Sequence, residues 1–217
     1  MKYFPSATAC ICLIFLGLTP LEKKKKAPNP EKALAMLMEG NRHFIDGKIT
    51  HLSYADEAKD KLLEKQTPFA AVVGCSDSRV PPELIFDQGL GDLFVVRDAG
   101  NVVGPIEMDS VEFAVAQLQV PLVVVLGHQN CGAVTAALRG RDQVPELDNI
   151  FPLIDKAFHT CQKDVPDKLI EAIYCNVREG VKILQNSPTI APFIEKKQVR
   201  VVGAYFDFES GKVTLVP

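Results

Sequence analysis

The sequence has little that would point to a nucleic-acid partner, a fibrous structure or a disulfide-dense scaffold. Its 24 Lys and Arg residues are outnumbered by 27 Asp and Glu residues, which gives a formal net charge of −3. Because phosphate backbones are bound by clustered Lys and Arg side chains, this balance argues against nucleic acid as a partner. The 14 Gly and 15 Pro residues are too few for a low-complexity chain. Six Cys residues in 217 do not make a disulfide-dense scaffold.

What remains is the composition of an ordinary globular protein. The chain is 47% hydrophobic and 24% charged, and it shows no internal repeat. Its length suits one domain, or one domain with a tail. We expect residues 30–217 to form that domain and residues 1–29 to be a separate signal or anchor segment with a Lys-rich linker.

The N-terminal segment also lacks an apolar run long enough for a comfortable membrane span, which takes about 20 residues. Its apolar run, Ala7–Leu18, follows a short basic start and fits the hydrophobic region of a secretory signal. No A-x-A-like cleavage site follows, and Lys23–Lys26 place positive charge where translocated segments avoid it. We therefore predict an exported, periplasmic protein. The alternatives are an uncleaved anchor that associates the protein with a membrane, and a cytoplasmic protein with an unusual tail.

The rest of the chain alternates between helical and strand patterns. Continuous apolar runs, typical of strands buried on both faces of a parallel sheet, occur at Phe69–Gly74, Leu93–Val96, Val120–Gly127 and Val199–Phe206. Helical stretches are expected at Glu31–Phe44, Tyr54–Lys65, Glu107–Leu118, Gly132–Arg139 and Leu169–Asn186. The alternation predicts an α/β fold with a mostly parallel central sheet and flanking helices. A hairpin around Ser210–Gly211 adds a C-terminal antiparallel edge strand.

Polar side chains that could carry chemistry follow two of the predicted strands. Cys75 comes directly after the first strand, and His128 and Cys131 follow the Val120–Gly127 run. Ligands of open α/β sheets bind at the carboxyl ends of strands, so the two clusters are expected to converge. Thiolate and imidazole donors suit Zn2+, and three protein ligands with one open position is the catalytic pattern. A Cys75–Cys131 disulfide is the alternative.

The other two cysteines of the domain do not join this pattern. Cys161 and Cys175 have no nearby His and fall in expected helices, so they are interpreted as packing residues. If the protein is exported, they could instead pair with each other.

Asp77 and Arg79 lie two residues apart in the loop that follows Cys75, a spacing that points both side chains to the same side. A surface ion pair would explain them without any catalytic role. Beside a divalent cation, however, a carboxylate has an electrostatic reason to be present. We interpret Arg79 as holding Asp77 ionised. Asp77 would then either accept a hydrogen bond from the metal's water or act as a conditional fourth ligand that closes the site.

The chain resembles the beta-class carbonic anhydrases from about Pro30 to its C-terminus. Several segments match the family's motifs in the same order and spacing: CSDSRV at Cys75–Val80, GDLFVVRDAGN at Gly91–Asn101, SVEFAVAQL at Ser110–Leu118, VVVLGHQNCGAV at Val123–Val134, NVREGVKIL at Asn176–Leu184, SP at Ser187–Pro188 and VVGAYFDFESGKV at Val201–Val213. The resemblance implies a zinc lyase that reversibly hydrates CO2 to bicarbonate and a proton.

The family pattern also implies roles that the residues alone would not suggest. Gln66 falls where the family places an amide that hydrogen-bonds substrate, and Phe94 falls on an apolar wall of the CO2 pocket. An apolar wall suits a neutral gas that needs few polar contacts. The family assembles as homodimers, often doubled into homotetramers, and the helix at Glu31–Phe44 agrees with an arm that packs on a neighbour.

Three departures from the family stand out. Phe113 occupies a position where many members have Tyr, and Asp98 stands where Asn is common. The members that trap bicarbonate in a separate pocket use a Trp shortly before the first zinc cysteine. This chain has no Trp, and Val72 stands at that point, so no such pocket is expected.

Two rival functions remain at this stage. A hydrolase of a CO2 analogue, carbonyl sulfide or carbon disulfide, could use the same scaffold and ligands. A zinc- or disulfide-stabilised binding module without activity is the rival from another class. The residues Asp77, Arg79 and Gln66 favour an enzyme.

Overall fold

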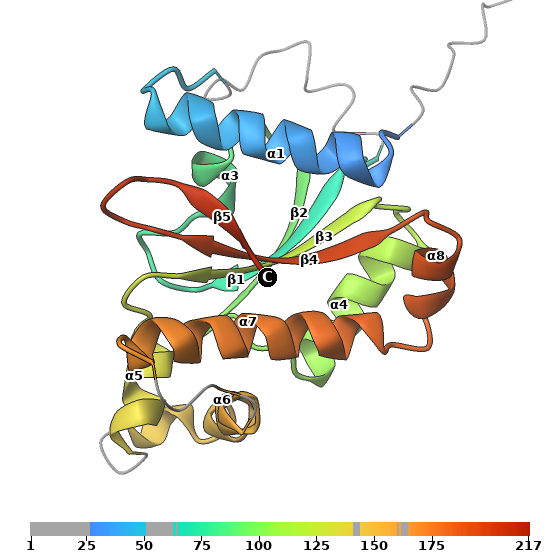
Figure 1. Ribbon diagram of the computed structural model, residues 1–217. Helices are drawn as coiled ribbons and strands as arrows, with labels where there is room; N and C mark the ends of the chain where they lie inside the picture. Colours follow the sequence, from blue (N-terminus) through green and yellow to red (C-terminus); the bar gives the residue numbers. More distant parts are fainter. Residues whose placement is uncertain (1–26, 51–62, 64, 141–143, 160, 162–164) are drawn as a thin grey trace, which may run out of the picture.

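The computed structural model describes residues 27–50, 63, 65–140, 144–159, 161 and 165–217. The predicted signal or anchor segment lies almost entirely outside the described residues, as does most of the helix expected at Tyr54–Lys65. Figure 1 shows a central sheet with helices on both of its faces. Among the described residues, no helix has the length and apolarity needed to traverse a bilayer.

The five-stranded sheet confirms the predicted α/β architecture. Its strands are β1 (Ala70–Cys75), β2 (Leu93–Asp98), β3 (Leu122–His128), β4 (Arg200–Phe206) and β5 (Val213–Val216). In space they follow the order β2-β1-β3-β4-β5, with parallel pairing throughout except for the antiparallel pair β4–β5 at one edge. Every residue of β1 and β3 is buried, which explains why these strands have continuous rather than alternating apolar sequences.

The two faces of the sheet are covered by different helices (Figure 1). Helix α1 (Pro30–Ile45) and the short α3 (Pro82–Ile85) lie over one face. The Asn29 side chain caps α1 by accepting a hydrogen bond from the Lys32 amide at 2.8 Å. At Gly40 the helix lies so close to the α3 segment that a Cβ would be 1.7 Å from the Phe86 carbonyl oxygen. Glycine therefore permits the contact between α1 and this segment.

Helices α4 (Pro105–Ala116) and α7 (Lys168–Gln185) cover the other face. The helix predicted at Glu107–Leu118 begins two residues earlier, because Pro105 can occupy its first turn and the Glu107 carboxylate accepts the Gly104 amide at 3.1 Å. Helix α7 packs against β3 at Gly127, where a Cβ would lie 2.6 Å from Val177 Cγ2. This close packing fixes the end of β3, where His128 is the last residue.

The shorter helices lie beyond these layers. They are α5 (Gly132–Arg139), the 3-10 turn η2 (Pro145–Leu147), α6 (Phe151–Phe158) and α8 (Ala191–Glu195). Of these, only α5 is expected from the sequence pattern: η2 and α8 are too short to show a clear helical period, whereas α6, which has eight residues as α5 does, is missed.

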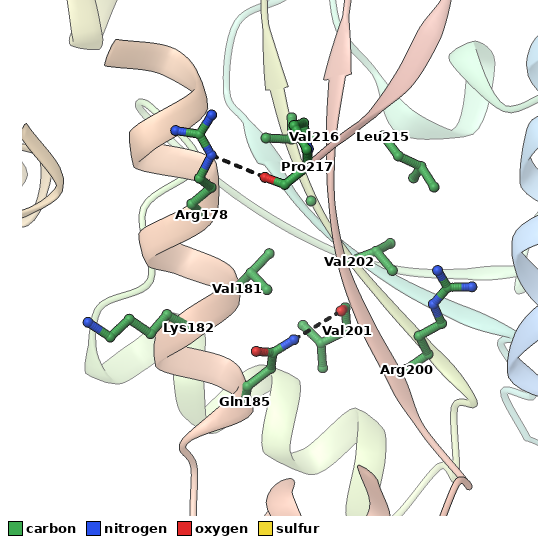
Figure 2. Close-up of a pocket in the computed structure, with 11 residues that line it drawn as sticks. Arg178, Val181, Lys182, Gln185, Arg200, Val201, Val202, Leu215, Val216 and Pro217 are labelled. Atoms are coloured by element: carbon green, nitrogen blue, oxygen red, sulfur yellow. Dashed lines mark hydrogen bonds between the residues drawn. The ribbon is translucent and has the colours of Figure 1, made fainter. Parts of the chain in front are cut away.

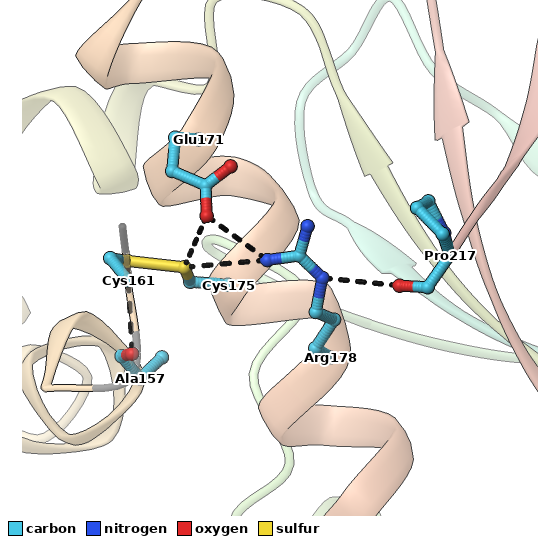
Figure 3. Close-up of a disulfide and its surroundings, with 6 residues drawn as sticks. All are labelled: Ala157, Cys161, Glu171, Cys175, Arg178 and Pro217. Atoms are coloured by element: carbon cyan, nitrogen blue, oxygen red, sulfur yellow. Dashed lines mark hydrogen bonds and ion pairs between the residues drawn. A yellow bond between two sulfur atoms is a disulfide. The ribbon is translucent and has the colours of Figure 1, made fainter. Parts of the chain in front are cut away.

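A disulfide joins Cys161, just after α6, to Cys175 in α7 (Figure 3). The interpretation of both residues as packing cysteines in helices is therefore wrong, and the pairing considered as its alternative is found. The physical reason is the packing of α6 against α7, which brings the two Cα atoms to 5.6 Å, within the normal range for a disulfide. Next to the bridge, Arg178 Nη1 donates to Glu171 Oε1 at 3.1 Å.

Candidate metal centre

Cys75, His128 and Cys131 converge at one end of the sheet, as the sequence predicts. Cys75 ends β1, His128 ends the neighbouring β3, and Cys131 lies just before α5. One donor atom from each residue lies within 4.8 Å of the others, and all three residues are buried. The two sulfur atoms are 4.0 Å apart and both cysteines are free thiols. The alternative of a Cys75–Cys131 disulfide is therefore wrong.

The turn between His128 and Cys131 is shaped by two polar residues. Asn130 adopts a left-handed conformation with φ 53°, which Asn tolerates better than most residues, and this reverses the chain before α5. The Gln129 amide donates to the Phe206 carbonyl at 2.9 Å, and the Gln129 side-chain oxygen accepts the Phe208 amide at 2.9 Å. These bonds tie the turn to the end of β4 and set the separation of the His128 ring and the Cys131 sulfur.

The His128 ring has one nitrogen satisfied and one free. Its Nδ1 lies 2.9 Å from the Gln129 carbonyl oxygen, which can only accept a hydrogen bond, so Nδ1 carries the proton. Its Nε2 therefore presents a lone pair, and this atom is buried without a hydrogen-bond partner. A buried nitrogen without a hydrogen-bond partner costs the folded protein free energy. One imidazole nitrogen together with two sulfurs is a donor set that Zn2+ prefers. The residues present thus fit a zinc ion.

The Cys75 sulfur is the more acidic of the pair. The Cys131 thiol donates to it, and the amides of Gly100 and Asp77 also favour the thiolate, which together lower the pKa of Cys75 to about 4. Hydrogen bonding to that thiolate, together with burial, raises the pKa of Cys131.

Asp77 and Arg79 form the ion pair expected from their spacing. Arg79 Nε donates to Asp77 Oδ1 at 2.9 Å, and Arg79 Nη2 donates to Asp77 Oδ2 at 2.7 Å. The Arg79 amide adds a third bond to Oδ1 at 3.0 Å. Hydrogen bonding to Arg79 is the main reason that the pKa of Asp77 lies well below its usual range. Oδ2 lies 4.0 Å from His128 Nε2, so the ionised carboxylate is at the rim of the ligand cluster.

Two further side chains at this rim were not found by sequence reasoning. Arg97 of β2 donates from Nε to the Cys75 carbonyl at 2.8 Å and from Nη2 to the Asp77 carbonyl at 2.6 Å, which holds the loop between them. Phe208 contacts both His128 and Arg79 from the turn between β4 and β5. Arg97 and Phe208 belong to the family-like segments, but neither has a local pattern that would indicate its partner.

Asp98, the residue that stands where Asn is common in the family, lies opposite Cys75 in the β1–β2 register. Its Oδ1 accepts the Val102 amide at 2.9 Å, and burial raises the pKa of this carboxyl to about 7.

Within a single chain, Gln66 and Phe94 do not reach the cluster. Gln66 is exposed and precedes β1, so that the whole strand, about 16 Å at 3.3 Å per residue, separates it from Cys75. Phe94 lies opposite Ala71, four residues or about 13 Å from the level of Cys75. Its ring instead lies 6.3 Å from that of Phe113, between ring centroids.

A separate basic groove lies between α7 and the strands β4 and β5 (Figure 2). It has a volume of about 310 Å³, and Arg178, Lys182 and Arg200 supply its positive charge. Within it, Arg178 Nε donates to the Pro217 carbonyl at 3.1 Å and Gln185 Nε2 donates to the Val201 carbonyl at 3.3 Å. None of the three cluster residues lines this groove.

Comparison with known proteins agrees with the geometry of the site. The carbonic anhydrase family model matches residues 70–213, which include all three donors of the cluster. The chain belongs to the beta-carbonic anhydrase family. Among its relatives, a carbonic anhydrase of Mycolicibacterium smegmatis is 39% identical over 192 residues, with 86% of this chain and 93% of the relative covered. Carbonic anhydrase 2 of Mycobacterium tuberculosis is 38% identical over 192 residues, again with 86% of this chain and 93% of the relative covered.

Solved beta-carbonic anhydrases share the fold. The Coccomyxa enzyme in complex with acetazolamide aligns with a TM-score of 0.64 and 26% identity, over 84% of this chain and 86% of that one. CafA of Aspergillus fumigatus aligns with a TM-score of 0.63 and 29% identity, over 85% and 89%. As a beta-carbonic anhydrase, the chain is a zinc lyase that hydrates CO2, and Cys75, His128 and Cys131 are a group in its described residues that could hold the zinc.

Proposed function

We propose that this chain catalyses the reversible hydration of CO2 to bicarbonate and a proton with Cys75, His128 and Cys131 holding zinc and with Asp77 and Arg79 orienting the attacking water. The observation that carries the proposal is the buried, unpartnered His128 Nε2, which faces two free sulfurs. Bound zinc is a Lewis acid that makes a water molecule nucleophilic near neutral pH.

Asp77 positions that water through its free acceptor capacity. Because Arg79 keeps the carboxylate ionised, Oδ2 would accept a hydrogen bond from the water and so orient its remaining lone pair for attack on CO2. The new carbon–oxygen bond forms as one C=O π bond of CO2 breaks, and the displaced electron pair becomes the charge of bicarbonate. The proton passes to buffer. The three hydrogen bonds from Arg79 favour this role over coordination by Asp77, which would have to give up some of them.

The proposal is tested by stopped-flow CO2 hydration on the full-length protein. Treatment with a zinc chelator should abolish turnover while the circular dichroism spectrum keeps its α/β shape, and added zinc should restore the rate. A folded, zinc-loaded protein that does not hydrate CO2 would overturn the proposal. In the same assay, carbonyl sulfide and carbon disulfide are offered in competition with CO2. Preferential turnover of either one would show that it, and not CO2, is the substrate.

We also propose that the active form is a homodimer or homotetramer in which a second copy supplies Gln66 and Phe94. Three observations support this assembly. Neither residue reaches the cluster of its own chain, β2 has a pairing partner on one side only among the described strands, and α4 exposes 76% of Ile106 and 47% of Phe113. Two beta-carbonic anhydrases of Sordaria macrospora, one of which aligns at 30% identity with a TM-score of 0.59, are described as tetrameric.

A complementation experiment tests this assembly. The chain with Gln66→Ala keeps its zinc ligands, whereas the chain with Cys131→Ser keeps Gln66 and loses a ligand. If Gln66 serves the neighbouring site, co-expression and purification of the hybrid should give more activity per zinc than the Gln66→Ala protein alone. Equal activity, or a monomer by sedimentation velocity, would overturn the proposal. The two variants carry different affinity tags so that the hybrid can be purified. Wild-type chains with the same pair of tags control for the effect of the tags.

We further propose that residues 1–29 direct export and that the domain of residues 30–217 works in an oxidising compartment. The apolar run Ala7–Leu18 and the Cys161–Cys175 disulfide support this, because disulfides persist mainly outside the reducing cytoplasm. N-terminal sequencing and cell fractionation test it. A periplasmic protein with a shortened N-terminus is expected. Retention in the membrane with Met1 in place would instead indicate an anchor, and a soluble cytoplasmic protein with free Cys161 and Cys175 thiols would overturn export.

A further inference from the structure

The sulfur of Cys75 accepts backbone hydrogen bonds from two different loops. The Asp77 amide, in the loop after β1, lies 3.4 Å from this sulfur. The Gly100 amide, in the loop after β2, lies 3.3 Å from it. Each N–H bond withdraws electron density from the thiolate, so the two amides together set how strongly this sulfur donates to a metal ion.

Gly100 is held in place by a side chain of helix α7. Asn176 of α7 donates from Nδ2 to the Gly100 carbonyl at 2.7 Å, and Asn176 is only 4% exposed. Gly100 has a left-handed φ of 93°, and a Cβ at this position would lie 3.1 Å from that of Ala133. The peptide groups on both sides of Gly100 are therefore fixed in orientation. The Gly100 carbonyl is bound to Asn176, and the Gly100 N–H is directed at the Cys75 sulfur.

We propose that Asn176 is a positioning residue for the zinc centre: it acts through the Gly100 carbonyl to aim the Gly100 N–H at the Cys75 sulfur. Asn176 is not one of the three donors of the cluster, and its Nδ2 bonds the Gly100 carbonyl. The inference rests on the proposed function, because it concerns a metal held by Cys75.

Asn41 provides a matched control in another part of the molecule. It is also a buried asparagine, 3% exposed, and its Nδ2 also donates to backbone carbonyls, those of Ile85 at 3.2 Å and Gly211 at 3.0 Å. It lies in α1, and its partners are not part of the ligand cluster. Substitution of Asn41 therefore reports the cost of losing a buried amide, without a change at the sulfur.

The test compares Asn176→Ala with Asn41→Ala in the full-length protein. The two readouts are zinc affinity, measured by competition with a chromophoric chelator, and the sulfur-to-cobalt charge-transfer band of the cobalt-substituted protein. For Asn176→Ala we expect zinc binding to weaken by about 10-fold. We expect the charge-transfer band to move to longer wavelength, since a sulfur that accepts fewer hydrogen bonds is easier to oxidise. Asn41→Ala should leave both unchanged.

The outcomes separate the inference from the function on which it rests. If the parent protein binds neither zinc nor cobalt, the proposed function fails. If the parent binds metal but Asn176→Ala matches it in affinity and spectrum, or if Asn41→Ala changes both as much, the positioning role of Asn176 is overturned. Should Asn176→Ala fail to fold, Asn176→Ser, which keeps a short donor, is measured in its place against Asn41→Ser with the same two expectations.

Discussion

The guanidinium of Arg79 lies over the ring of Phe208, with its Cζ 4.3 Å from the ring centroid. The same ring meets the His128 imidazole edge-on, with 5.7 Å between ring centroids. One aromatic side chain from the β4–β5 turn therefore contacts both the cation that holds Asp77 and a zinc ligand. The contact links the C-terminal hairpin to the ligand cluster.

Replacement of Phe208 should reduce activity without removing zinc. Phe208→Leu deletes the aromatic face under Arg79, and a cation–π contact at an exposed site is worth about 0.5–1 kcal/mol. We expect kcat/KM for CO2 hydration to fall by about 2- to 5-fold, measured by stopped flow with zinc content as the control. Phe208→Tyr keeps the ring and should retain the wild-type rate. Equal losses in both variants would contradict a role for the aromatic face.

Removal of the Asp77 carboxylate should separate metal binding from turnover. Asp77→Ala leaves Cys75, His128 and Cys131 in place, so zinc content should stay at the wild-type level. Because the water loses its hydrogen-bond acceptor, we expect kcat to fall by about 100-fold or more. Elemental analysis and stopped-flow assays of the same preparation check both statements. Wild-type turnover in this variant would remove Asp77 from the mechanism.

Arg79 should stabilise the folded chain near neutral pH and lose this effect in acid. Hydrogen bonds from Arg79 lower the pKa of folded Asp77 below its unfolded value of about 4. The stabilisation by this carboxylate is therefore complete above pH ~4 and is lost as the pH falls toward the folded pKa. In Arg79→Gln the folded pKa moves back toward ~4, so the free energy of unfolding should decline less steeply with acidification. Denaturant titrations between neutral pH and acid, compared with wild type, measure this difference.

Loss of one sulfur should eliminate the metal. Cys131→Ser replaces a buried thiolate ligand by a hydroxyl, a poor zinc donor, so both zinc content and CO2 hydration should drop to background. Since metal that binds only the folded chain stabilises it, the melting temperature should also fall to that of chelator-treated wild type. A variant that retains zinc would show that Cys131 is not a ligand. Cys175→Ser, which alters a cysteine outside the cluster, is the control for zinc content.

The disulfide between α6 and α7 should contribute to stability and leave catalysis unaffected. Its cysteines are 14 residues apart, and closing a loop of that size stabilises a protein by about 3 kcal/mol. Cys161→Ser should lower the free energy of unfolding by about that amount. The double variant with Cys175→Ser should lose little more, because the second substitution removes no further bridge. Urea denaturation with and without reductant measures the effect, and a wild-type curve that reductant does not alter would contradict it.

The sequence predicts the sheet and the ligand set well because both are local patterns. Continuous Val-rich runs mark β1 and β3, and the polar residues directly after them include all three metal donors. Parallel strands that pair side by side must bring such strand ends together. The position of Cys75 next to His128 and Cys131 therefore follows from the pairing of β1 with β3.

Other features depend on contacts between distant parts of the chain, which periodicity does not contain. Arg97 binds carbonyls about 20 residues away, and Asn176 binds one that is 76 residues away. The Cys161–Cys175 bridge depends on how α6 packs against α7. Family resemblance alone suggests the roles of Gln66 and Phe94, because one chain does not carry them to its own cluster.

The two sulfurs of the centre come from positions 56 residues apart, one at the end of β1 and one in the turn after β3, two strands that must already lie side by side. A nascent chain that ends before Leu122 offers one donor of the three, so metal loading waits until most of the domain has been synthesised. A zinc ion held by these residues would join the end of β1 to the end of β3, and it could bind all three donors only after the two strands have paired.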